Sequence, residues 1–343
     1  MARAGERHPT RRPHEKRGSE LVFELVDLPA DRGLRNAQAR GRTTDVTLVG
    51  DGDEVPNLRQ AHATRVAHTA SATSLRDRSG IGSLGRRCGI LGGMAVEILG
   101  PGEMERLRRA GRAAAATLAF VGERLRPGVT TADVDRWVRE HTAALGGRCS
   151  QLGYKGFPAA VCVSPNDVVC HGIPDARVAL RPGDIVNVDV TTEIDGFHGD
   201  TSATFVMSGA SPDALRLVDV ARRCRDAGMA VVRDGARLGD VGAAVEEVAR
   251  AAGCTVVREF GGHGIGRRMH MDPHVPHTGR RGTGPRLRAG MALTIEPMIN
   301  LGGAAVHVLG DGWTVVTSDG SLSAQFEHTV LVTQGGAEIV TYA

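Results

Sequence analysis

The sequence is poor in aromatic residues, in long apolar runs and in paired cysteines, and each shortage excludes a class of protein. Aromatic side chains make up 3% of the 343 residues. No stretch approaches the ~20 apolar residues of a membrane-spanning helix, and the polar N-terminus lacks the apolar segment of a signal peptide. The six cysteines form no CxxC pair and are too sparse for a disulfide framework. We therefore expect reduced thiols, no membrane association and a cytoplasmic location.

Charge and aromatic content divide the chain near Met94. Residues 1–93 carry 16 Lys+Arg and 11 Asp+Glu, a net charge of 16 − 11 = +5, whereas residues 94–343 carry the remaining 26 and 28, a net charge of −2. Phe23 is the only aromatic residue before Met94. A segment with so few large apolar side chains cannot bury enough surface to offset the entropy of ordering it. Residues 94–343 are therefore predicted to be the working domain.

Three interpretations of residues 1–93 remain open. The favoured hypothesis is that Met94 is the true translational start and that the preceding residues are upstream sequence. Alternatively, the segment is a disordered accessory tail that binds RNA or acidic partners through its basic residues, or a folded domain whose only plausible strand is Leu21–Leu28. An intact mass of the native protein that includes residues 1–93 would contradict the start at Met94.

Four amphipathic helices are predicted, because apolar residues recur there at spacings of three and four. The expected positions are Met104 to Val121; a helix capped by Thr130 and Asp133, with Val134, Trp137, Val138 and Leu145 facing inward; a helix begun by Ser211-Pro212, with Leu215, Val218, Ala221 and Cys224 facing inward; and about Asp240 to Ala252, closed by Gly253.

Strand patterns follow each pair of helices. Asp184–Thr192 and Gly199–Met207 flank Asp195-Gly196, a strong signal for a hairpin turn. Met291–Glu296 and Ala324–Thr333 are further apolar strands. Two helices followed by strands, twice over, predict an α+β domain of two similar halves.

The hairpin predicts a pair of carboxylates on one face. If Asp195-Gly196 is a two-residue turn, facing residues have numbers that sum to 391, so Asp200 opposes Thr191 and Asp189 opposes Ser202. Because strand side chains alternate, Asp189 and Asp200 then share a face as diagonal neighbours, roughly 7–8 Å apart at Cα. Two carboxylates at that separation can bind one pair of metal ions about 3.5–4 Å apart.

Two more acids and a histidine complete a candidate metal site. Glu296 and Glu327 stand in apolar strands, where a carboxylate is costly to bury unless it is paired or bound to a cation. Any one of these acids alone could be an edge residue facing water; four of them together with His263 favour a metal site. The glycines around His263 (Gly261-Gly262-His263-Gly264) let the backbone approach closely. Such a hard, oxygen-rich set suits two divalent ions of Mn, Fe, Co or Zn.

Two further histidines are candidates for chemistry, although each alone is more typical of a structural or surface position. His171 lies in Val168–Pro174, and His270 lies seven residues after His263. Cys170 beside His171 invites a cysteine-nucleophile interpretation, which we discount because adjacent strand residues point to opposite faces.

At this point the sequence resembles the type I methionine aminopeptidases. The similarity runs from about Met94 to near the C-terminus and rests on five motifs in the family's order and spacing: VCVSPNDVVCHGIP (Val161–Pro174), DIVNVDVTTEIDGFHGDTSATF (Asp184–Phe205), GGHGIGRRMH (Gly261–His270), TIEPM (Thr294–Met298) and SLSAQFEHTV (Ser321–Val330).

The resemblance implies a pita-bread fold, two pseudo-symmetric halves around a central antiparallel sheet, with two metal ions that activate a bridging hydroxide. It implies that Asp189 binds one ion, that Asp200 and Glu327 bridge both, and that His263 and Glu296 complete the second. By the same analogy Glu296 moves the proton. His270 stabilises the oxyanion, and His171 contacts the scissile amide.

The resemblance also implies a methionine pocket, with ordinary core packing as the alternative explanation for each of its residues. They are Tyr154, Phe157, Cys162 and Trp313, a lining compatible with a thioether. The sequence departs from the family at Met269, where an aromatic residue is more usual, and at Met271-Asp272, where an acidic pair is more usual. Both changes concern side-chain preference at the edge of the site.

The expected activity is removal of the N-terminal methionine from nascent proteins and peptides with a small second residue. The expected enzyme is a monomer that meets the ribosome transiently and binds no nucleic acid by sequence. Two alternatives remain. An Xaa-Pro aminopeptidase or prolidase normally carries a folded N-terminal domain, and a non-catalytic pita-bread binding protein normally loses metal ligands.

Overall fold

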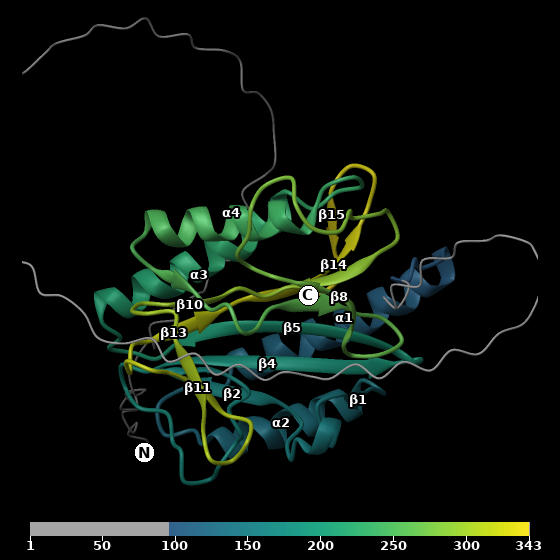
Figure 1. Ribbon diagram of the computed structural model, residues 1–343. Helices are drawn as coiled ribbons and strands as arrows, with labels where there is room; N and C mark the ends of the chain where they lie inside the picture. Colours follow the sequence, from purple (N-terminus) through teal and green to yellow (C-terminus); the bar gives the residue numbers. More distant parts are fainter. Residues whose placement is uncertain (1–95, 343) are drawn as a thin grey trace, which may run out of the picture. The chain divides into compact units, whose positions relative to one another are not determined.

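The computed structural model describes residues 96–342 (Figure 1). The predictions for residues 1–93, the start at Met94 and Cys88 lie outside these described residues. Within the described range, the cysteines are all free, and no helix is long and apolar enough to cross a membrane. The helices are α1 (Pro101–Gly122), α2 (Thr131–Ala144), α3 (Pro212–Ala230) and α4 (Leu238–Ala251), with a short 3-10 helix, η1 (Tyr154–Gly156).

The strands form one large and two small antiparallel sheets. The large sheet has the order β1-β4-β5-β14-β9-β7-β8, with β2 paired to β4 and β15 paired to β14; the small sheets are β13-β10-β6 and β11-β12-β3. The strand bounds are β1 Arg148–Cys149, β2 Cys162–Pro165, β3 Val168–Cys170, β4 Ile185–Ile194, β5 Phe197–Val206, β6 Thr255–Val256, β7 Gly262–Gly264, β8 Met271–Val275, β9 Ala292–Ile295, β10 Met298–Asn300, β11 Val306–Val308, β12 Val315–Thr317, β13 Ser323–Gln325, β14 Glu327–Val332 and β15 Ala337–Ile339.

The predicted helix caps are confirmed. Thr130 accepts a hydrogen bond from the backbone N–H of Asp133 at 3.1 Å, and the Asp133 carboxylate accepts from the backbone N–H of Thr130 at 3.1 Å. Ser211 accepts from the backbone N–H of Ala214 at 3.1 Å. Gly253 follows α4 with φ 69°, the left-handed conformation expected after a helix. Local capping chemistry therefore locates these helix ends correctly.

Two predicted inward-facing leucines are wrong. Leu145, at the end of α2, is 42% exposed, and Leu215 in α3 is 53% exposed. In α3, Ala221 and Cys224 are buried as predicted. Leu217 lies in the buried stripe in place of Leu215. A spacing of three and four fits more than one stripe when apolar residues are frequent, and the packing partner selects among them.

The hairpin is confirmed in full register. Asp195 and Gly196 both have positive φ, 53° and 76°, as a two-residue turn of the favoured hand requires. Thr191 pairs with Asp200 and Asp189 pairs with Ser202, so every facing pair sums to 391. Asp189 and Asp200 therefore lie on the same face of the sheet.

The single strand predicted over Ala324–Thr333 is instead two strands in different sheets. β13 pairs with β10, whereas β14, which begins at Glu327, pairs with β5 and β9. The break falls at Phe326, where the chain passes from one sheet to the other. An apolar run carries no signal for such a change of partner, since both parts are equally buried.

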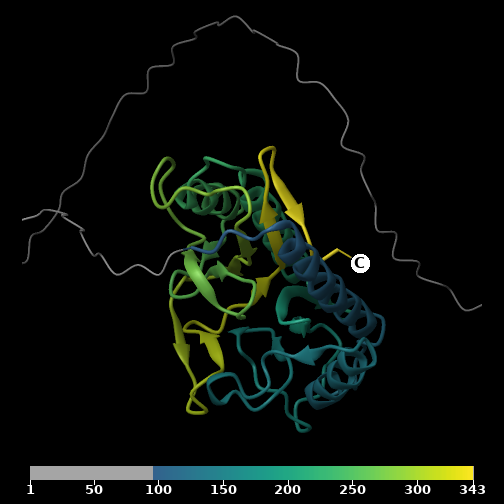
Figure 2. The same cartoon turned by 90° about the vertical axis from the view of Figure 1, so that its right-hand side faces the viewer.

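The helices cover one face of the large sheet, and the carboxylates of the predicted site lie on the other face. The α1 and α2 helices pack together, and α1 also packs against β4 and β5. Figure 2 shows α1 running along the outside of the molecule. Val186, Val188 and Val190 of β4 are fully buried in the core cluster that contains residues of both helices. The residues that alternate with them, Asp189 and Thr191, point to the opposite face, as the predicted α+β architecture requires.

Candidate metal centre and active site

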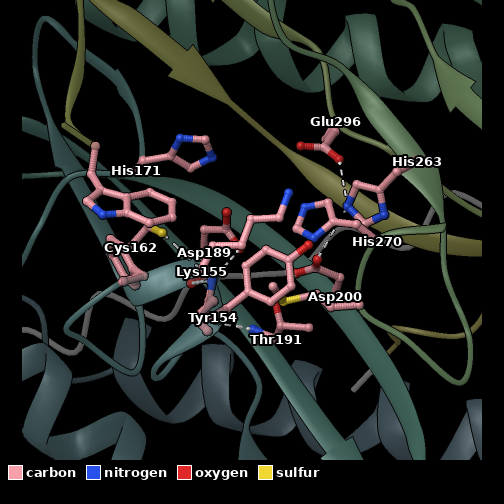
Figure 3. Close-up of a pocket in the computed structure, with 14 residues that line it drawn as sticks. Tyr154, Lys155, Cys162, His171, Asp189, Thr191, Asp200, His263, His270 and Glu296 are labelled. Atoms are coloured by element: carbon pink, nitrogen blue, oxygen red, sulfur yellow. Dashed lines mark hydrogen bonds and ion pairs between the residues drawn. The ribbon is translucent and has the colours of Figure 1, made fainter. Parts of the chain in front are cut away.

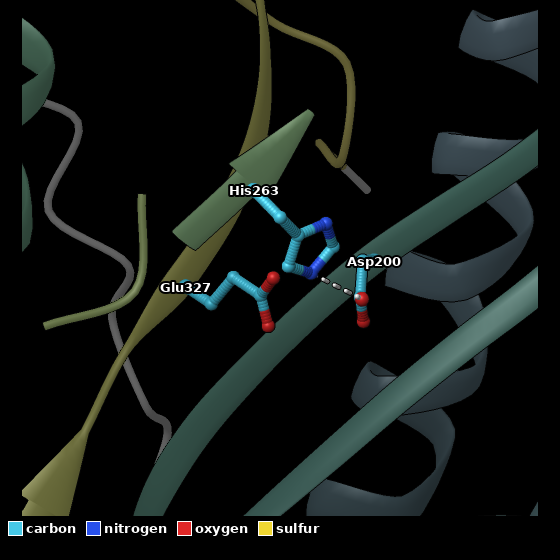
Figure 4. A group of neighbouring side chains, drawn as sticks. All are labelled: Asp200, His263 and Glu327. Atoms are coloured by element: carbon cyan, nitrogen blue, oxygen red, sulfur yellow. Dashed lines mark ion pairs between the residues drawn. The ribbon is translucent and has the colours of Figure 1, made fainter. Parts of the chain in front are cut away.

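A cavity of about 250 Å³ opens on the face of the sheet away from α1 and α2. It collects ten of the eleven residues predicted for the site, and Figure 3 shows them converging from separate parts of the chain. The eleventh, Glu327, lies beside Asp200 and His263 (Figure 4). The ten that line the cavity are Tyr154, Phe157, Cys162, His171, Asp189, Asp200, His263, His270, Glu296 and Trp313.

The β4–β5 hairpin supplies the first two acids. Asp200 is 5% exposed, and the Thr191 hydroxyl across the ladder donates a hydrogen bond to its Oδ1 at 2.7 Å. Asp189 is the more accessible of the two and accepts from the amide of Gln151 at 3.2 Å. Each carboxylate thus has one oxygen held by a neighbour and one free for another ligand.

His263 reaches the cavity because its flanking glycines allow a close backbone approach. A Cβ at Gly262 would lie 2.2 Å from the carbonyl oxygen of Thr294, and a Cβ at Gly264 would lie 2.1 Å from that of Asp272. Any other residue would push the short strand β7 away from β8 and β9. The predicted structural role of these glycines is confirmed, and it fixes the imidazole position.

The candidate ligand atoms converge on a common centre. One ligand atom each from Asp200, His263 and Glu327 lies within 4.8 Å of the others (Figure 4). His263 Nε2 is 3.8 Å from Asp200 Oδ2 and 3.5 Å from Glu296 Oε1. In addition to burial, repulsion from Asp189 raises the pKa of Glu327, and repulsion from Asp200 and Glu296 raises the pKa of Asp189. Together with the distances, these effects place all five residues in one interacting group.

Without a cation, these carboxylates resist ionisation. Burial, with repulsion from Asp200, raises the pKa of Glu296 to about 8, and burial raises that of Asp200 to about 6. Burial and the neighbouring acids raise the pKa values of Asp189 and Glu327 well above their usual range. Burial, assisted by His270, lowers the pKa of His263 to about 3, so its imidazole is neutral, the form that binds metals.

The donor set fits a pair of divalent ions. Glu327 is 1% exposed, and its Oε1 has no hydrogen-bond partner within the described residues. A buried carboxylate oxygen left in this way is costly unless a cation contacts it. Four carboxylates and one neutral imidazole form a hard site of the kind that holds such ions.

Polar side chains that the sequence did not identify hold the ligands in place. Thr294 donates to Glu296 Oε1 at 2.7 Å and accepts from the backbone N–H of His263 at 2.9 Å. Gln325 donates to Glu296 Oε2 at 3.1 Å, and the Glu296 N–H donates to His277 Nε2 at 3.1 Å. The alternation of a strand puts Thr294 and Glu296 on one face, a signal available in the sequence.

The far side of the cavity is apolar. Phe157 and Cys162 are buried beside Ala159, with Ile173 and Trp313 packed against them. The Phe157 and Trp313 rings meet edge to face at a centroid distance of 5.2 Å. Met269, which departs from the family pattern, is 5% exposed and also lines the cavity. The arrangement is a cup that an unbranched apolar side chain can fill.

His270 and His171 lie between the two sides of the cavity. His270 stacks on Tyr154 at a centroid distance of 5.0 Å and lies 4.1 Å from the ring of His263. Partial desolvation of the ring, with a contribution from Lys155, lowers the pKa of His270 to about 4, so the ring is neutral. His171 has φ 56° and faces the ring of Trp313. Both imidazoles can therefore donate a hydrogen bond into the cavity.

Cys170 does not line this cavity. Its thiol is buried in a separate apolar cluster, and burial raises its pKa well above the usual range. A thiol in that environment stays protonated and is a poor nucleophile. The structure thus argues against Cys170 as a nucleophile, as expected from the sequence.

Residues 105–334 match the family described as Metallopeptidase family M24. The chain is 47% identical over 249 residues to methionine aminopeptidase A of Synechocystis sp., covering 73% of this chain and 98% of that protein. It is 45% identical to the methionine aminopeptidase of Escherichia coli, covering 72% and 94%.

Solved structures give the same result. The methionine aminopeptidase of Rickettsia prowazekii has a TM-score of 0.71 and 43% identity, covering 72% of this chain and all of that chain. That of Thermotoga maritima has a TM-score of 0.72 and 40% identity, covering 73% and all of that chain. The prolidase of Pyrococcus furiosus is similar at a TM-score of 0.57 and 17% identity, which shows a shared fold alone.

Proposed function

The chain belongs to metallopeptidase family M24, and from its similarity to the methionine aminopeptidases of that family we propose that it removes the N-terminal methionine from polypeptides. The observation that carries this proposal is the juxtaposition of the five-ligand cluster with the apolar cup in one cavity. The cluster suits the reacting amide, and the cup suits the methionine side chain.

The ligand roles come from the resemblance to the methionine aminopeptidases. By that resemblance, Asp189 would hold one ion, Asp200 and Glu327 would serve both ions, and His263 and Glu296 would complete the second. Two divalent ions held there supply an acidified water and Lewis-acid polarisation of a peptide carbonyl. Cobalt, manganese, iron and zinc all suit these donors, and the oxygen-rich set disfavours ions that require thiolates.

Glu296 is suited to hold the proton that the attacking water gives up. Its two oxygens are fixed by the hydroxyl of Thr294 and the amide of Gln325. The carboxylate therefore keeps one orientation while its protonation state changes. A proton held there can pass to the departing amine.

The two cavity histidines act on the scissile amide. His270 is neutral and held by stacking on Tyr154, so its N–H is a preorganised donor for the oxyanion of the tetrahedral intermediate. His171, on the side of Trp313, contacts the amide nitrogen as it leaves. Neither ring needs to move or change charge before the substrate binds.

The cup sets the preference for methionine. Phe157, Cys162 and Trp313 surround a space without hydrogen-bonding demands, and a thioether makes favourable contacts with aromatic rings. Tyr154 closes the cup next to His270. We expect small second residues, because the amide must fit between His171 and His270 while the methionine fills the cup.

The expected setting is that of nascent-chain processing. We propose that the enzyme acts in the cytoplasm as a monomer, meets the ribosome transiently, and recognises neither a membrane nor a nucleic-acid sequence. We further propose that residues 94–343 carry all of the chemistry. Sedimentation of the full chain, alone and with ribosomes, measures the monomeric state and the ribosome contact.

The decisive experiment measures methionine release from Met-Ala-Ser and Met-Lys-Ser by the full chain. The protein is stripped of metal and then reloaded with Mn²⁺ or Co²⁺. We expect release from Met-Ala-Ser only after reloading, and little release from Met-Lys-Ser. Failure to cleave either peptide despite bound metal would contradict the proposal, and cleavage of Xaa-Pro peptides instead would favour the prolidase alternative.

A further inference from the structure

Lys155 is an unusual residue at the mouth of the cavity. The chain has 42 Lys+Arg residues, and only Lys16 and Lys155 are lysines. Lys155 lies in η1, between Gly153 and Gly156, and all three residues have positive φ. This turn brings an exposed side chain to the cavity, where Lys155 is the only lysine or arginine among the lining residues (Figure 3).

The ammonium group of Lys155 has no anionic partner in the part of the chain that the structure describes. Its Nζ lies 5.3 Å from the centroid of the Tyr154 ring. Nearby arginines behave differently: Arg148 is paired with Glu193, and Arg267 is paired with Glu97 and Glu103. The acids that line the cavity are Asp189, Asp200 and Glu296, and none lies within ion-pair distance of Lys155. The positive charge is therefore available to a ligand.

The position of Lys155 points to the part of the substrate beyond the scissile bond. In the proposed function, the methionine side chain fills the cup of Phe157, Cys162 and Trp313, and the reacting carbonyl lies at His270. The exposed side chain of Lys155 extends toward His270 (Figure 3), close enough for its charge to lower the pKa of that histidine. The peptide must leave the cavity through its mouth, and therefore passes this ammonium group.

We propose that Lys155 binds a carboxylate carried by the substrate after its second residue, and so determines specificity beyond the methionine. The carboxylate is either an acidic side chain at the third position or the free C-terminus of a short peptide. This inference rests on the proposed function and extends it to a second recognition site. Lys155 does not contact the reacting atoms, so its contribution belongs in KM rather than kcat.

The test compares the peptides Met-Ala-Glu-Ser, Met-Ala-Gln-Ser and Met-Ala-Lys-Ser, all amidated at the C-terminus, with the full chain loaded with Mn²⁺. We expect kcat/KM to fall in that order, with about five-fold between the first and last, the size of a solvent-exposed charge pair. The difference should lie in KM and shrink as salt is raised. Met-Ala against Met-Ala-amide then measures the free C-terminus separately.

Variants assign the effect to one side chain. Lys155→Met should remove the charge preference, Lys155→Glu should reverse it, and Lys155→Arg should retain it. Arg268→Met is the matched control, because Arg268 is an exposed cation two residues from His270 that does not line the cavity. It should leave the preference for glutamate intact.

The outcomes separate this inference from the proposed function. Equal kcat/KM for the three peptides, or a preference that Lys155→Glu fails to reverse, would overturn the role of Lys155 while leaving methionine release established. A loss of preference in Arg268→Met equal to that in Lys155→Met would also overturn it. Release of methionine from none of the peptides would overturn the proposed function, and this inference with it.

Discussion

One side of the cavity is lined by ionisable groups held away from water, and the other by apolar groups that gain from the same burial. On the first side, Glu296 and Glu327 are 7% and 1% exposed, close to other acids. On the second, Phe157 and Cys162 are 3% and 5% exposed among apolar neighbours. Burial therefore destabilises the fold on one side and stabilises it on the other. We therefore expect a bound cation to stabilise the first side and to leave the stability of the second unchanged.

The largest expected effect is that of Asp200→Asn. We expect kcat/KM to fall about 10³-fold or more, because the proposed ligand of both ions is lost. Several kcal/mol of transition-state stabilisation would be lost with it. The metal-free variant should nevertheless be more stable than the metal-free parent, because one buried like charge has been removed. Metal content, kinetics and thermal unfolding with and without chelator measure this.

The exposed Asp219→Asn in α3 is the control for that substitution. A metal-free Asp200→Asn protein that unfolds at a lower temperature than the metal-free parent would contradict the claim that this side of the cavity is destabilising without metal.

The next effect is that of His270→Ala. We expect kcat to fall by about 10²–10³-fold, the usual result of removing one oxyanion donor. The metal content should stay the same, because His270 lies between the two sides and is not a proposed ligand. Metal loss equal to that of Asp200→Asn would show that the two residues have the same role, contrary to the assignment.

A smaller effect is expected for Thr294→Val. The substitution keeps the shape but removes the hydroxyl that bonds Glu296 and the backbone of His263. Metal affinity should weaken about 10–100-fold, as for other residues that orient ligands. Thr142→Val is the matched control, since Thr142 is buried in α2 and its hydroxyl has no partner there. Calorimetric titration of both variants with Mn²⁺ tests the difference; equal affinities would argue against the orienting role.

On the apolar side, Phe157→Ala should raise KM for methionine substrates about 10-fold, because part of the cup is lost. It should also lower the free energy of unfolding by about 3–5 kcal/mol, with metal content unchanged. Phe197→Ala, a core substitution away from the cavity, should lower stability without raising KM. If Phe157→Ala releases metal, the two sides are not independent.

The smallest effect concerns pH and the metal-free protein. The pKa values of Glu296 and Asp200 are raised in the folded state, to about 8 and about 6. Their contribution to stability is therefore complete below the unfolded pKa values near 4 and is lost as pH rises through the folded values. We expect the Tm of the metal-free protein to fall by about 5 °C or more between pH 5 and pH 8. A metal-free Tm that rises across this window would contradict the raised pKa values.

The sequence predicted those parts of the fold that depend on local chemistry. The Asp195-Gly196 turn sets the register of the hairpin, and the caps at Thr130 and Ser211 set two helix starts; both signals act within a few residues. Leu145 and Leu215 were misplaced, because the buried face of a helix is selected by its packing partner. The division of Ala324–Thr333 at Phe326 was missed for a related reason, since sheet membership depends on distant strands.

For the site, the sequence predicted the main residues but not the side chains that orient them. The ligands stand out because a carboxylate in an apolar strand is rare, and ten of the eleven named residues line one cavity while the last adjoins it. Thr294, Gln325 and Gln151 were not identified, since threonine and glutamine are ordinary in strands and loops. Only the distances show which of them contact a ligand. The roles of the site residues remain predictions until the variants are measured.

The register of the β4–β5 hairpin also limits which insertions and deletions this sequence can accept during evolution. Residues added at the Asp195-Gly196 turn lie beyond the ladder and leave Asp189 and Asp200 on the same face. A single residue inserted or deleted in the strand between the turn and either aspartate would turn that carboxylate to the opposite face, against α1 and α2. Relatives that keep the chemistry should therefore differ in length at the turn and hardly at all in the strand residues 190–194 and 197–199, which separate the turn from Asp189 and Asp200.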